Sequence, residues 1–166
     1  MARLVLVGLP GVGKTSVARA LADAWHCEAL DTDDLLATRV GVSTPQYLRR
    51  EGEWSFRKRE LDALMEAVRM DAVVATGGGV VCSSVARGVL TRELTLWLDC
   101  CDEEIISRLD AIDRPLLGDD VEIGIARLRH ERSAWYREVS KARIDASGSL
   151  DEVLERVRAN IEKVET

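Results

Sequence analysis

Eight residues near the N-terminus have the types and the spacing of a phosphate-binding loop. Segment 8–15 reads Gly-Leu-Pro-Gly-Val-Gly-Lys-Thr and fits the pattern G-x-x-x-x-G-K-[ST]. Its glycines let the backbone wrap a phosphate chain, and the unpaired N–H groups that open the next helix point at the anion. We expect Lys14 to reach the β- and γ-phosphates and the Thr15 hydroxyl to bind Mg²⁺. The residues expected at the nucleotide are Gly11, Val12, Gly13, Lys14, Thr15 and Ser16.

Two carboxylates, Asp31 and Asp33, directly follow a second apolar run and are spaced to face one side of an extended chain. Phosphate-loop enzymes generally need a carboxylate near the metal ion. The segment after the apolar run 72–75 contains no acid, so we expect Asp31 to help bind Mg²⁺. The alternative for Asp33 is a purely structural one, as the N-cap of a helix that begins near Asp34.

Arg57 and Arg132 each interrupt an apolar stripe on a predicted helix. A buried guanidinium is costly unless it meets an anion. An internal ion pair, or a side chain that extends to water, would satisfy either arginine alone. Two such helices in a chain with a phosphate loop favour a small carboxylated ligand, held bidentately. The stripes are Trp54, Arg57, Leu61, Leu64, Met65 and Val68 on one helix, and Ile125, Leu128, Arg132, Trp135 and Val139 on the other.

Three successive glycines, residues 77–79, follow the apolar run 72–75. Glycine weakens any regular element that contains it, so the segment is either a flexible turn or a place where backbone N–H groups approach a ligand. Because the glycines follow a buried strand, we favour the second interpretation.

Segment 110–120 is polar, contains Pro115 and Gly118, and lacks periodicity. These features predict a mobile lid between two helices. Arg114 is its only basic residue and has the character of an arginine finger, although an exposed loop arginine is the alternative. Arg108, in the last turn of the preceding helix, either complements the helix dipole or flanks the nucleotide.

The elements that must position these residues alternate along the chain. Alternation of buried strands and helices predicts an α/β fold, a mainly parallel sheet with helices on both faces and ligands at the carboxyl ends of its strands. The first helix follows the phosphate loop and carries the stripe Val17, Ala20, Leu21 and Ala24. Strands are expected over 4–7, 27–30, 72–75, 94–98 and 142–144, and further helices over 34–40, 46–50, 53–69, 83–90, 102–109, 121–140 and 149–163.

Composition narrows the class of protein. The 166 residues fit one domain, and the formal net charge of −6 argues against a nucleic-acid partner. The chain has no apolar run long enough to span a bilayer and no room for a signal peptide before the first strand. The cysteines, Cys27, Cys82, Cys100 and Cys101, lack metal-binding spacing. We interpret them as reduced core residues of a cytoplasmic protein.

Taken together, the motifs resemble the shikimate kinase family over essentially the whole length. That family has a phosphate loop, D-T-D, G-E-x-x-F-R-x-x-E, G-G-G, R-P-L-L and E-R-x-x-x-Y, in this order. The corresponding segments here are residues 8–15, 31–33, 52–60, 77–79, 114–117 and 131–136. One departure is the loop 145–149, which is short and lacks the basic residue that some members place near the adenine.

The resemblance implies a monomeric P-loop kinase of one domain, 1–166, with strand order 2-3-1-4-5, a substrate-binding region about 32–60 and a lid about 110–120. It implies ATP-dependent phosphorylation of the 3-hydroxyl of shikimate, a step toward chorismate and the aromatic amino acids. By matching position, Asp33 would bind the ring hydroxyls and help take a proton, and Asp31 would hold Mg²⁺ through water, beside Thr15. The residues expected at the substrate carboxylate are Arg57, Gly78, Gly79 and Arg132; Arg114 would close over the phosphates, and Arg108 would lie near the adenine.

Three other functions fit the phosphate loop. Two are related kinases that act on gluconate or on a nucleoside monophosphate, and the third is a nucleotide-binding regulator without catalysis. A GTPase switch is excluded, because it needs an N-K-x-D motif and Asn160 is the only asparagine in the chain.

Overall fold

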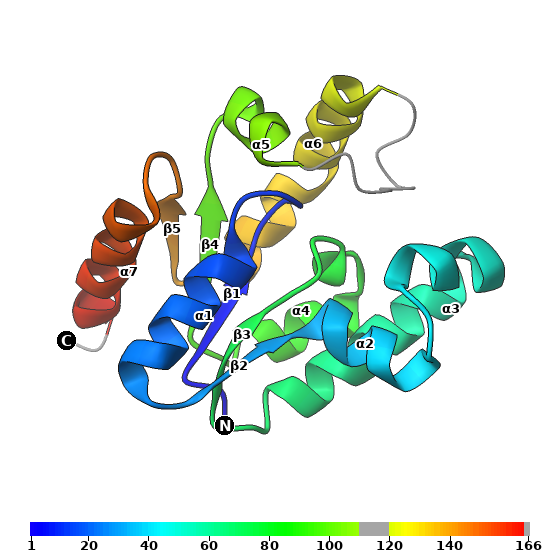
Figure 1. The fold of residues 1–166 in the computed structure, drawn as a ribbon, viewed down its shortest axis with the longest axis horizontal. Helices are drawn as coiled ribbons and strands as arrows, with labels where there is room; N and C mark the ends of the chain where they lie inside the picture. Colours follow the sequence, from blue (N-terminus) through cyan, green and yellow to red (C-terminus); the bar gives the residue numbers. More distant parts are fainter. Residues whose placement is uncertain (110–119, 165–166) are drawn as a thin grey trace.

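The computed structural model describes residues 1–109 and 120–164. Its elements, labelled in Figure 1 apart from η1, are β1 (Leu4–Val7), α1 (Lys14–Trp25), β2 (Glu28–Asp31), α2 (Thr32–Val40), α3 (Thr44–Ala67), β3 (Ala72–Ala75), the 3₁₀ helix η1 (Val80–Cys82), α4 (Ser84–Leu90), β4 (Thr95–Asp99), α5 (Asp102–Arg108), α6 (Val121–Val139), β5 (Ala142–Asp145) and α7 (Leu150–Val164).

The five strands form one parallel sheet in the order β2-β3-β1-β4-β5, which confirms the predicted order. Every residue of β1, β3 and β4 is buried, as expected for strands covered on both faces, whereas the edge strands β2 and β5 are partly exposed. All the strands run in one direction, so their carboxyl ends meet at a single edge of the sheet.

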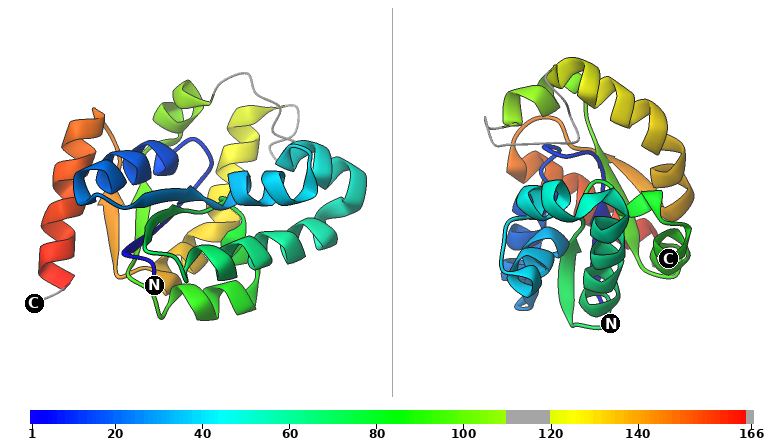
Figure 2. Two further views of the ribbon diagram at one scale, coloured as in Figure 1. Left: turned by 60° about the horizontal axis from the view of Figure 1, so that its bottom comes forward. Right: turned by 90° about the vertical axis from the view of Figure 1, so that its right-hand side faces the viewer.

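Helices cover both faces of the sheet (Figures 1 and 2). Helix α1 packs on β1, β2 and β3 and lies beside α7, while α6 packs on β4 and contacts both α4 and α5. Between these layers lies a continuous apolar core that includes Leu21, Leu96 and Ile125. In the part of the chain that the structure describes, no helix combines the length and apolarity needed to cross a membrane.

Helix α3 is broken at Gly52, which has φ 81° and ψ 169°. Only glycine adopts this conformation readily, because a Cβ would clash with the backbone. The break separates two helical pieces, as the sequence predicted. The first piece begins with a capping box in which the side chains of Ser43 and Gln46 each bond to the other's backbone N–H.

The buried face of the second piece differs from the predicted stripe. Trp54, placed on the inward stripe, has 80% of its surface exposed, and Phe56 is buried instead. Phe56 packs with Leu36 and Ala63 in a small cluster of buried side chains, distinct from the main core. The buried face of this helix is therefore turned from the predicted face by about one residue position, or about 100°. Glu60 lies on the buried face as well.

The cysteine prediction is only partly right. Cys100 is buried, Cys27 and Cys82 are partly buried, and Cys101 is exposed, with all four thiols free. Burial raises the pKa of Cys100 to about 11.

Candidate active site

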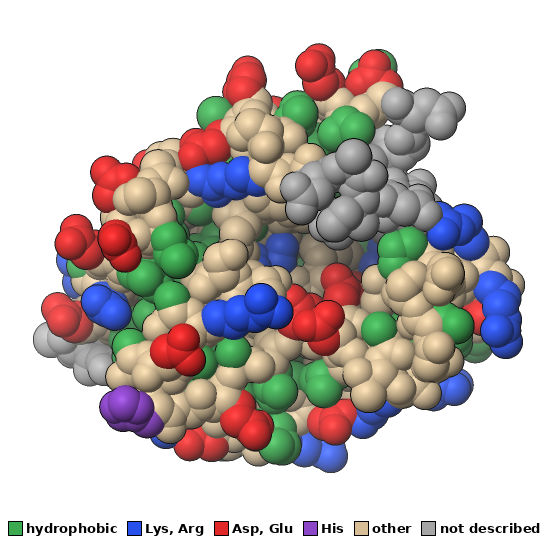
Figure 3. Space-filling model, viewed as in Figure 1, with side chains coloured by type: hydrophobic (Ala, Val, Ile, Leu, Met, Phe, Trp, Pro, Cys, Tyr) green, Lys and Arg blue, Asp and Glu red, His purple; other side chains and the backbone are tan. Residues whose placement is uncertain are grey.

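A cleft of about 780 Å³ opens along the carboxyl edge of the sheet. It is visible as a hollow in Figure 3, with basic side chains inside it. Both the phosphate loop and the substrate-side motifs line this cleft, so segments far apart in the sequence meet in one place. Of the predicted site residues that the structure describes, all line the cleft; they are Gly11, Val12, Gly13, Lys14, Thr15, Ser16, Asp31, Asp33, Arg57, Gly78, Gly79, Arg108 and Arg132.

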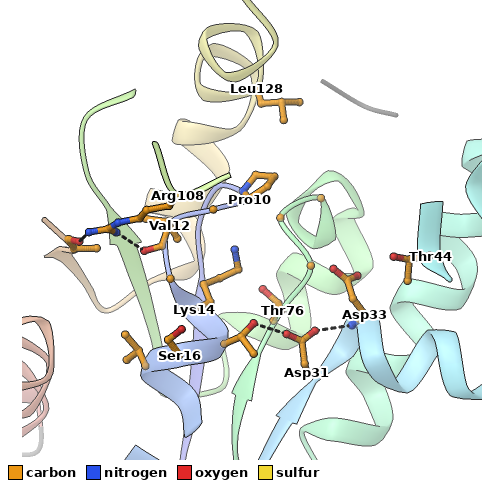
Figure 4. Close-up of a pocket in the computed structure, with 18 of the residues that line it drawn as sticks. Pro10, Val12, Lys14, Ser16, Asp31, Asp33, Thr44, Thr76, Arg108 and Leu128 are labelled. Carbon is orange, nitrogen blue, oxygen red and sulfur yellow. Dashed lines mark hydrogen bonds between the residues drawn. The ribbon is translucent and has the colours of Figure 1, made fainter. Parts of the chain in front are cut away.

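The phosphate loop joins β1 to α1. Gly13 is the N-cap of α1 and has φ 104°, a left-handed conformation that favours glycine, and no side chain caps the helix there. The first N–H groups of α1 therefore face the cleft, where the helix dipole favours an anion. Lys14 is 8% exposed. Its Nζ donates to the carbonyl oxygens of Gly8 and Leu9, both at 2.9 Å, and Figure 4 shows it pointing into the pocket.

Asp31 connects the phosphate loop to α2. Its Oδ2 accepts a 2.6 Å hydrogen bond from Thr15 Oγ1, and its Oδ1 accepts one of 2.9 Å from the backbone N–H of Asp33 (Figure 4). Asp31 is thus the N-cap of α2, and the alternative that Asp33 caps a later helix is wrong. The Asp33 carboxylate instead faces the glycine segment, since a Cβ on Gly77 would lie 2.8 Å from its Oδ1.

The side-chain oxygen atoms of Thr15 and Asp31 suit Mg²⁺, provided that other ligands complete the coordination of the ion. Both residues offer hard oxygen atoms, the type Mg²⁺ prefers. No group of three or more metal-ligating His, Cys, Asp or Glu side chains exists among residues 1–109 and 120–164. Mg²⁺ typically binds through one or two protein oxygens together with phosphate oxygens and water. The arrangement therefore suits an ion that enters with a nucleotide.

At the other end of the cleft, Arg57 forms an ion pair with Glu60. Arg57 Nη1 lies 2.8 Å from Glu60 Oε2, and Nη2 lies 3.2 Å from Oε1 of the exposed Glu53. Burial lowers the pKa of Arg57, but its interaction with Glu60 outweighs that effect and the pKa is raised. Burial also raises the pKa of Glu60, against the charges of Arg57 and Arg132. The two guanidinium groups therefore share the charge of one buried carboxylate.

Arg57 and Arg132 retain unmet hydrogen-bonding capacity. The Nε atoms of both are buried and have no hydrogen-bond partner within the described residues. Arg132 is 4% exposed, so water cannot easily compensate. Buried guanidinium nitrogens without partners are costly. The geometry thus provides for an anionic ligand between α3 and α6.

The glycine segment after β3 packs tightly against both halves of the cleft. A Cβ on Gly79 would lie 2.0 Å from Arg57 Nη1, and one on Gly78 would lie 2.9 Å from Cδ of Pro10 in the phosphate loop. The Tyr136 hydroxyl donates a 2.5 Å hydrogen bond to the Gly78 carbonyl. The interpretation of the segment as a place of close backbone approach is consistent with these contacts, and a loose turn is not.

Arg108 lies beside the phosphate loop rather than on an open helix surface. Its Nη1 donates to the Val12 carbonyl at 3.1 Å, and its Nη2 donates to the Ala146 carbonyl at 3.0 Å (Figure 4). Glu104 holds the same guanidinium at 2.5 Å. Arg114 and the predicted lid lie outside the described residues, apart from Asp120, which caps α6.

Sequence reasoning assigned no role to three residues that line this cleft or contact residues that line it. Glu60 and Tyr136 were present in the motifs but were not assigned to positioning the arginines or the glycines. The signal for Glu60 was its place three residues after Arg57 on the same helix. Glu104 had a comparable signal, four residues before Arg108.

The phosphate loop lies at one end of the cleft, and the site for an anion between Arg57 and Arg132 lies at the other. Both are at the carboxyl edge of the parallel sheet. This arrangement defines the class: a P-loop kinase that acts on a small molecule.

Comparisons with known proteins identify the family. A family model described as shikimate kinase matches residues 10–162. A shikimate kinase of Corynebacterium jeikeium is 36% identical over 148 residues, covering 88% of this chain and 80% of that protein. One from Enterococcus faecalis is 32% identical over 162 residues, covering 95% and 96%. The chain belongs to the shikimate kinase family.

Solved structures agree with this assignment. Shikimate kinase from Acinetobacter baumannii in complex with shikimate superposes with a TM-score of 0.90 at 31% identity, covering 96% of this chain and 93% of that one. The enzyme from Aquifex aeolicus gives 0.82 at 28% identity, with 98% and 96% covered. The P-loop kinase fold predicted from the sequence is confirmed.

Proposed function

We propose that this chain transfers the γ-phosphoryl group of ATP to the 3-hydroxyl of shikimate, giving shikimate 3-phosphate and ADP in the pathway to aromatic amino acids. The observation that carries the proposal is the pair of buried guanidinium groups with unpartnered Nε atoms in the same cleft as the phosphate loop. Shikimate supplies both a carboxylate for these groups and a hydroxyl to receive the phosphate. Membership of the family supports the choice of substrate.

The transfer is an in-line displacement. The 3-hydroxyl oxygen attacks the γ-phosphorus, the bond from that phosphorus to the β–γ bridging oxygen breaks, and ADP leaves with the electron pair. Asp33 would hold the acceptor hydroxyls and accept the proton that the attacking oxygen loses. Arg57 and Arg132, with the backbone of Gly78 and Gly79, would fix the carboxylate so that the hydroxyl faces the phosphate.

The residues at the phosphate-loop end of the cleft would stabilise the charge on the phosphates. Lys14 would exchange its carbonyl partners for phosphate oxygens, and the N–H groups at the start of α1 would bind the same chain. Thr15 and Asp31 would hold Mg²⁺ with phosphate oxygens and water, and the ion neutralises charge on the β- and γ-phosphates. Arg114 retains the role that the motif implies, closing over the transferring group. Arg108 would contact the adenine.

A coupled assay of ADP release tests the proposal. ADP release should require shikimate and should stay at background with gluconate or AMP as acceptor. If the chain binds ADP but shows no shikimate-dependent turnover, the result would favour a nucleotide-binding regulator without catalysis. Arg57→Ala should raise KM for shikimate and spare ATP binding. Arg59→Ala is the matched control, because Arg59 is an exposed arginine of the same helix whose partners, Asp62 at 3.5 Å and Tyr47, do not line the cleft.

We further infer that one copy of the chain suffices for activity and that the enzyme works in the cytoplasm, where its nucleotide is available. Support for a site that needs one copy comes from the cleft itself, since the phosphate loop and both substrate-side arginines of a single chain line one cavity. Sedimentation at the assay concentration measures this directly. A dimer under those conditions would contradict the inference.

A further inference from the structure

At the end of the cleft that would hold the acceptor, part of the wall is the start of α3. Thr44, Pro45 and Leu48 line the cleft there, together with Phe56 from the second piece of the helix. Residues one turn apart share a face of a helix, so the first piece of α3 turns this face to the cleft. Among these four side chains only that of Thr44 is polar. Its hydroxyl is therefore the group with which this wall can recognise a polar ligand.

The start of α3 holds Thr44 in place without using its hydroxyl. The capping box belongs to Ser43 and Gln46, and the ring of Pro45 fixes the backbone of the next position. Threonine is β-branched, so its side chain has few rotamers. Among the described residues the Thr44 hydroxyl has no hydrogen-bond partner. Because a hydroxyl both donates and accepts, this one can serve a bound hydroxyl in either sense.

Other polar groups at this end of the cleft already have partners. The Thr76 hydroxyl donates to a carbonyl of β1 at 3.0 Å, and the Gly77 N–H donates to the Thr32 hydroxyl at 2.9 Å. Glu60 Oε2 lies 2.8 Å from Arg57 Nη1, and a Cβ on Gly77 would lie 2.6 Å from Glu60 Oε1. The arginines and the rest of the glycine segment would hold the carboxylate of the acceptor. Its ring hydroxyls therefore depend on groups nearer to α2 and the start of α3.

The shape of shikimate decides which hydroxyl reaches Thr44. Its carboxylate is on C1, its hydroxyls are on C3, C4 and C5, and C3 and C5 lie on opposite sides of the axis from C1 to C4. If the 3-hydroxyl faces the phosphate loop, the 5-hydroxyl faces away from it. Figure 4 shows Thr44 on that side, beyond Asp33 as seen from Lys14, with its hydroxyl turned toward the Asp33 carboxylate.

We propose that Thr44 is a specificity-determining residue that binds the 5-hydroxyl of shikimate, an inference that rests on the function proposed above. Asp33 would hold the neighbouring 3- and 4-hydroxyls, and the apolar side chains beside Thr44 would pack on the ring carbons. A hydroxyl that enters a half-buried wall without a partner costs free energy. A site built to bond a substrate hydroxyl rejects the analogue that lacks it, because the partner group is then left unpaired.

Calorimetric titration at saturating ADP measures this contact without catalysis. Thr44→Val keeps nearly the same shape and removes the hydroxyl. The dissociation constant of shikimate should rise about fivefold, as expected for one neutral hydrogen bond. That of 5-deoxyshikimate should not change, whereas that of 4-deoxyshikimate, which keeps the 5-hydroxyl, should rise by the same factor as that of shikimate. An unchanged constant for shikimate, or an equal rise for all three acceptors, would overturn the proposal.

Two further variants separate the hydroxyl from the local fold. Thr44→Ser keeps the hydroxyl and should bind shikimate within about twofold of the parent. Thr38→Val is the matched control, because Thr38 is an exposed threonine of α2 that does not line the cleft. It should leave the constants of all three acceptors unchanged. A loss in Thr44→Ser as large as that in Thr44→Val would point to packing and overturn the proposal.

Turnover distinguishes this inference from the proposed function. In Thr44→Val, KM for shikimate should rise about fivefold while kcat stays within about twofold, because the bonded hydroxyl is not the one that reacts. If shikimate is phosphorylated but Thr44→Val matches the parent, the function stands and the Thr44 contact fails. If shikimate binds with the expected dependence on Thr44 but releases no ADP from ATP, the contact stands and the proposed function fails. Absence of any shikimate binding would overturn both.

Discussion

Replacing Gly79 with alanine should displace Arg57 and leave the fold intact. A Cβ at this position would lie 2.0 Å from Arg57 Nη1, while ordinary contact begins at 3.4 Å, so the guanidinium must retreat by about 1.4 Å. Backbone strain is not the cause, because Gly79 has φ −94° and ψ −1°, a conformation open to alanine. What moves is the end of a flexible side chain.

The size of the effect follows from the contacts that the retreat breaks. Arg57 loses its 2.8 Å pair with Glu60 and its alignment with the substrate carboxylate. Hydrogen bonds to charged groups contribute about 1.5–3 kcal/mol, and each 1.4 kcal/mol is a factor of ten. KM for shikimate should therefore rise about 10- to 100-fold, with the ADP dissociation constant unchanged.

Gly88→Ala in α4 is the matched control. No atom lies within 4 Å of the added Cβ, so the substitution should stabilise the helix by about 0.5–1 kcal/mol and leave KM unchanged. Shikimate titrations at saturating ATP and calorimetry with ADP provide the two measurements. A folded Gly79→Ala protein with a KM for shikimate within about twofold of the parent would refute the placement of Arg57 on the carboxylate.

Three further substitutions or reactions test other parts of the site. Asp31→Asn keeps a side chain that can cap α2 but removes the metal-binding charge, so the Mg²⁺ concentration for half-maximal rate should rise about tenfold or more, with Mg²⁺-free ADP binding unchanged. Tyr136→Phe removes the donor to the Gly78 carbonyl and should cost about 1–3 kcal/mol, a fall in Tm of roughly 3–9 °C by calorimetry; an unchanged Tm would contradict the bond. At pH 8, iodoacetamide should label exposed Cys101 well before Cys100, whose pKa of about 11 leaves little thiolate until the pH approaches that value or the protein unfolds.

Local patterns predicted the strands and the phosphate loop because each depends on adjacent residues. Continuous apolar runs matched the central strands, and the glycine pattern located the turn before α1. Asp31 could be proposed as the metal-binding carboxylate by elimination, since the strand end beside it carries no acid. The predicted order of the strands in the sheet came from the resemblance to the shikimate kinase family and not from the periodicity of the sequence.

The orientation of the second piece of α3 could not be predicted from periodicity. Trp54 and Phe56 are both large and apolar but lie about 200° apart around the helix. Each therefore belongs to a different candidate stripe, and a helical wheel alone does not say which stripe is buried. The choice depends on Leu36 of α2, which packs on Phe56 in the folded chain. Glu104 was missed for a related reason, because its second partner, Gly148, lies 44 residues away.

The small cluster of Leu36, Phe56 and Ala63 has a consequence for motion. Helices α2 and α3, which carry Asp33 and Arg57, pack partly on this cluster rather than on the main core. Regions with their own small core open at a lower free energy than the body of a protein. Backbone amides of these helices should therefore exchange with deuterium well before those of β1 and β3, so that the acceptor side can loosen to admit shikimate while the nucleotide side stays closed.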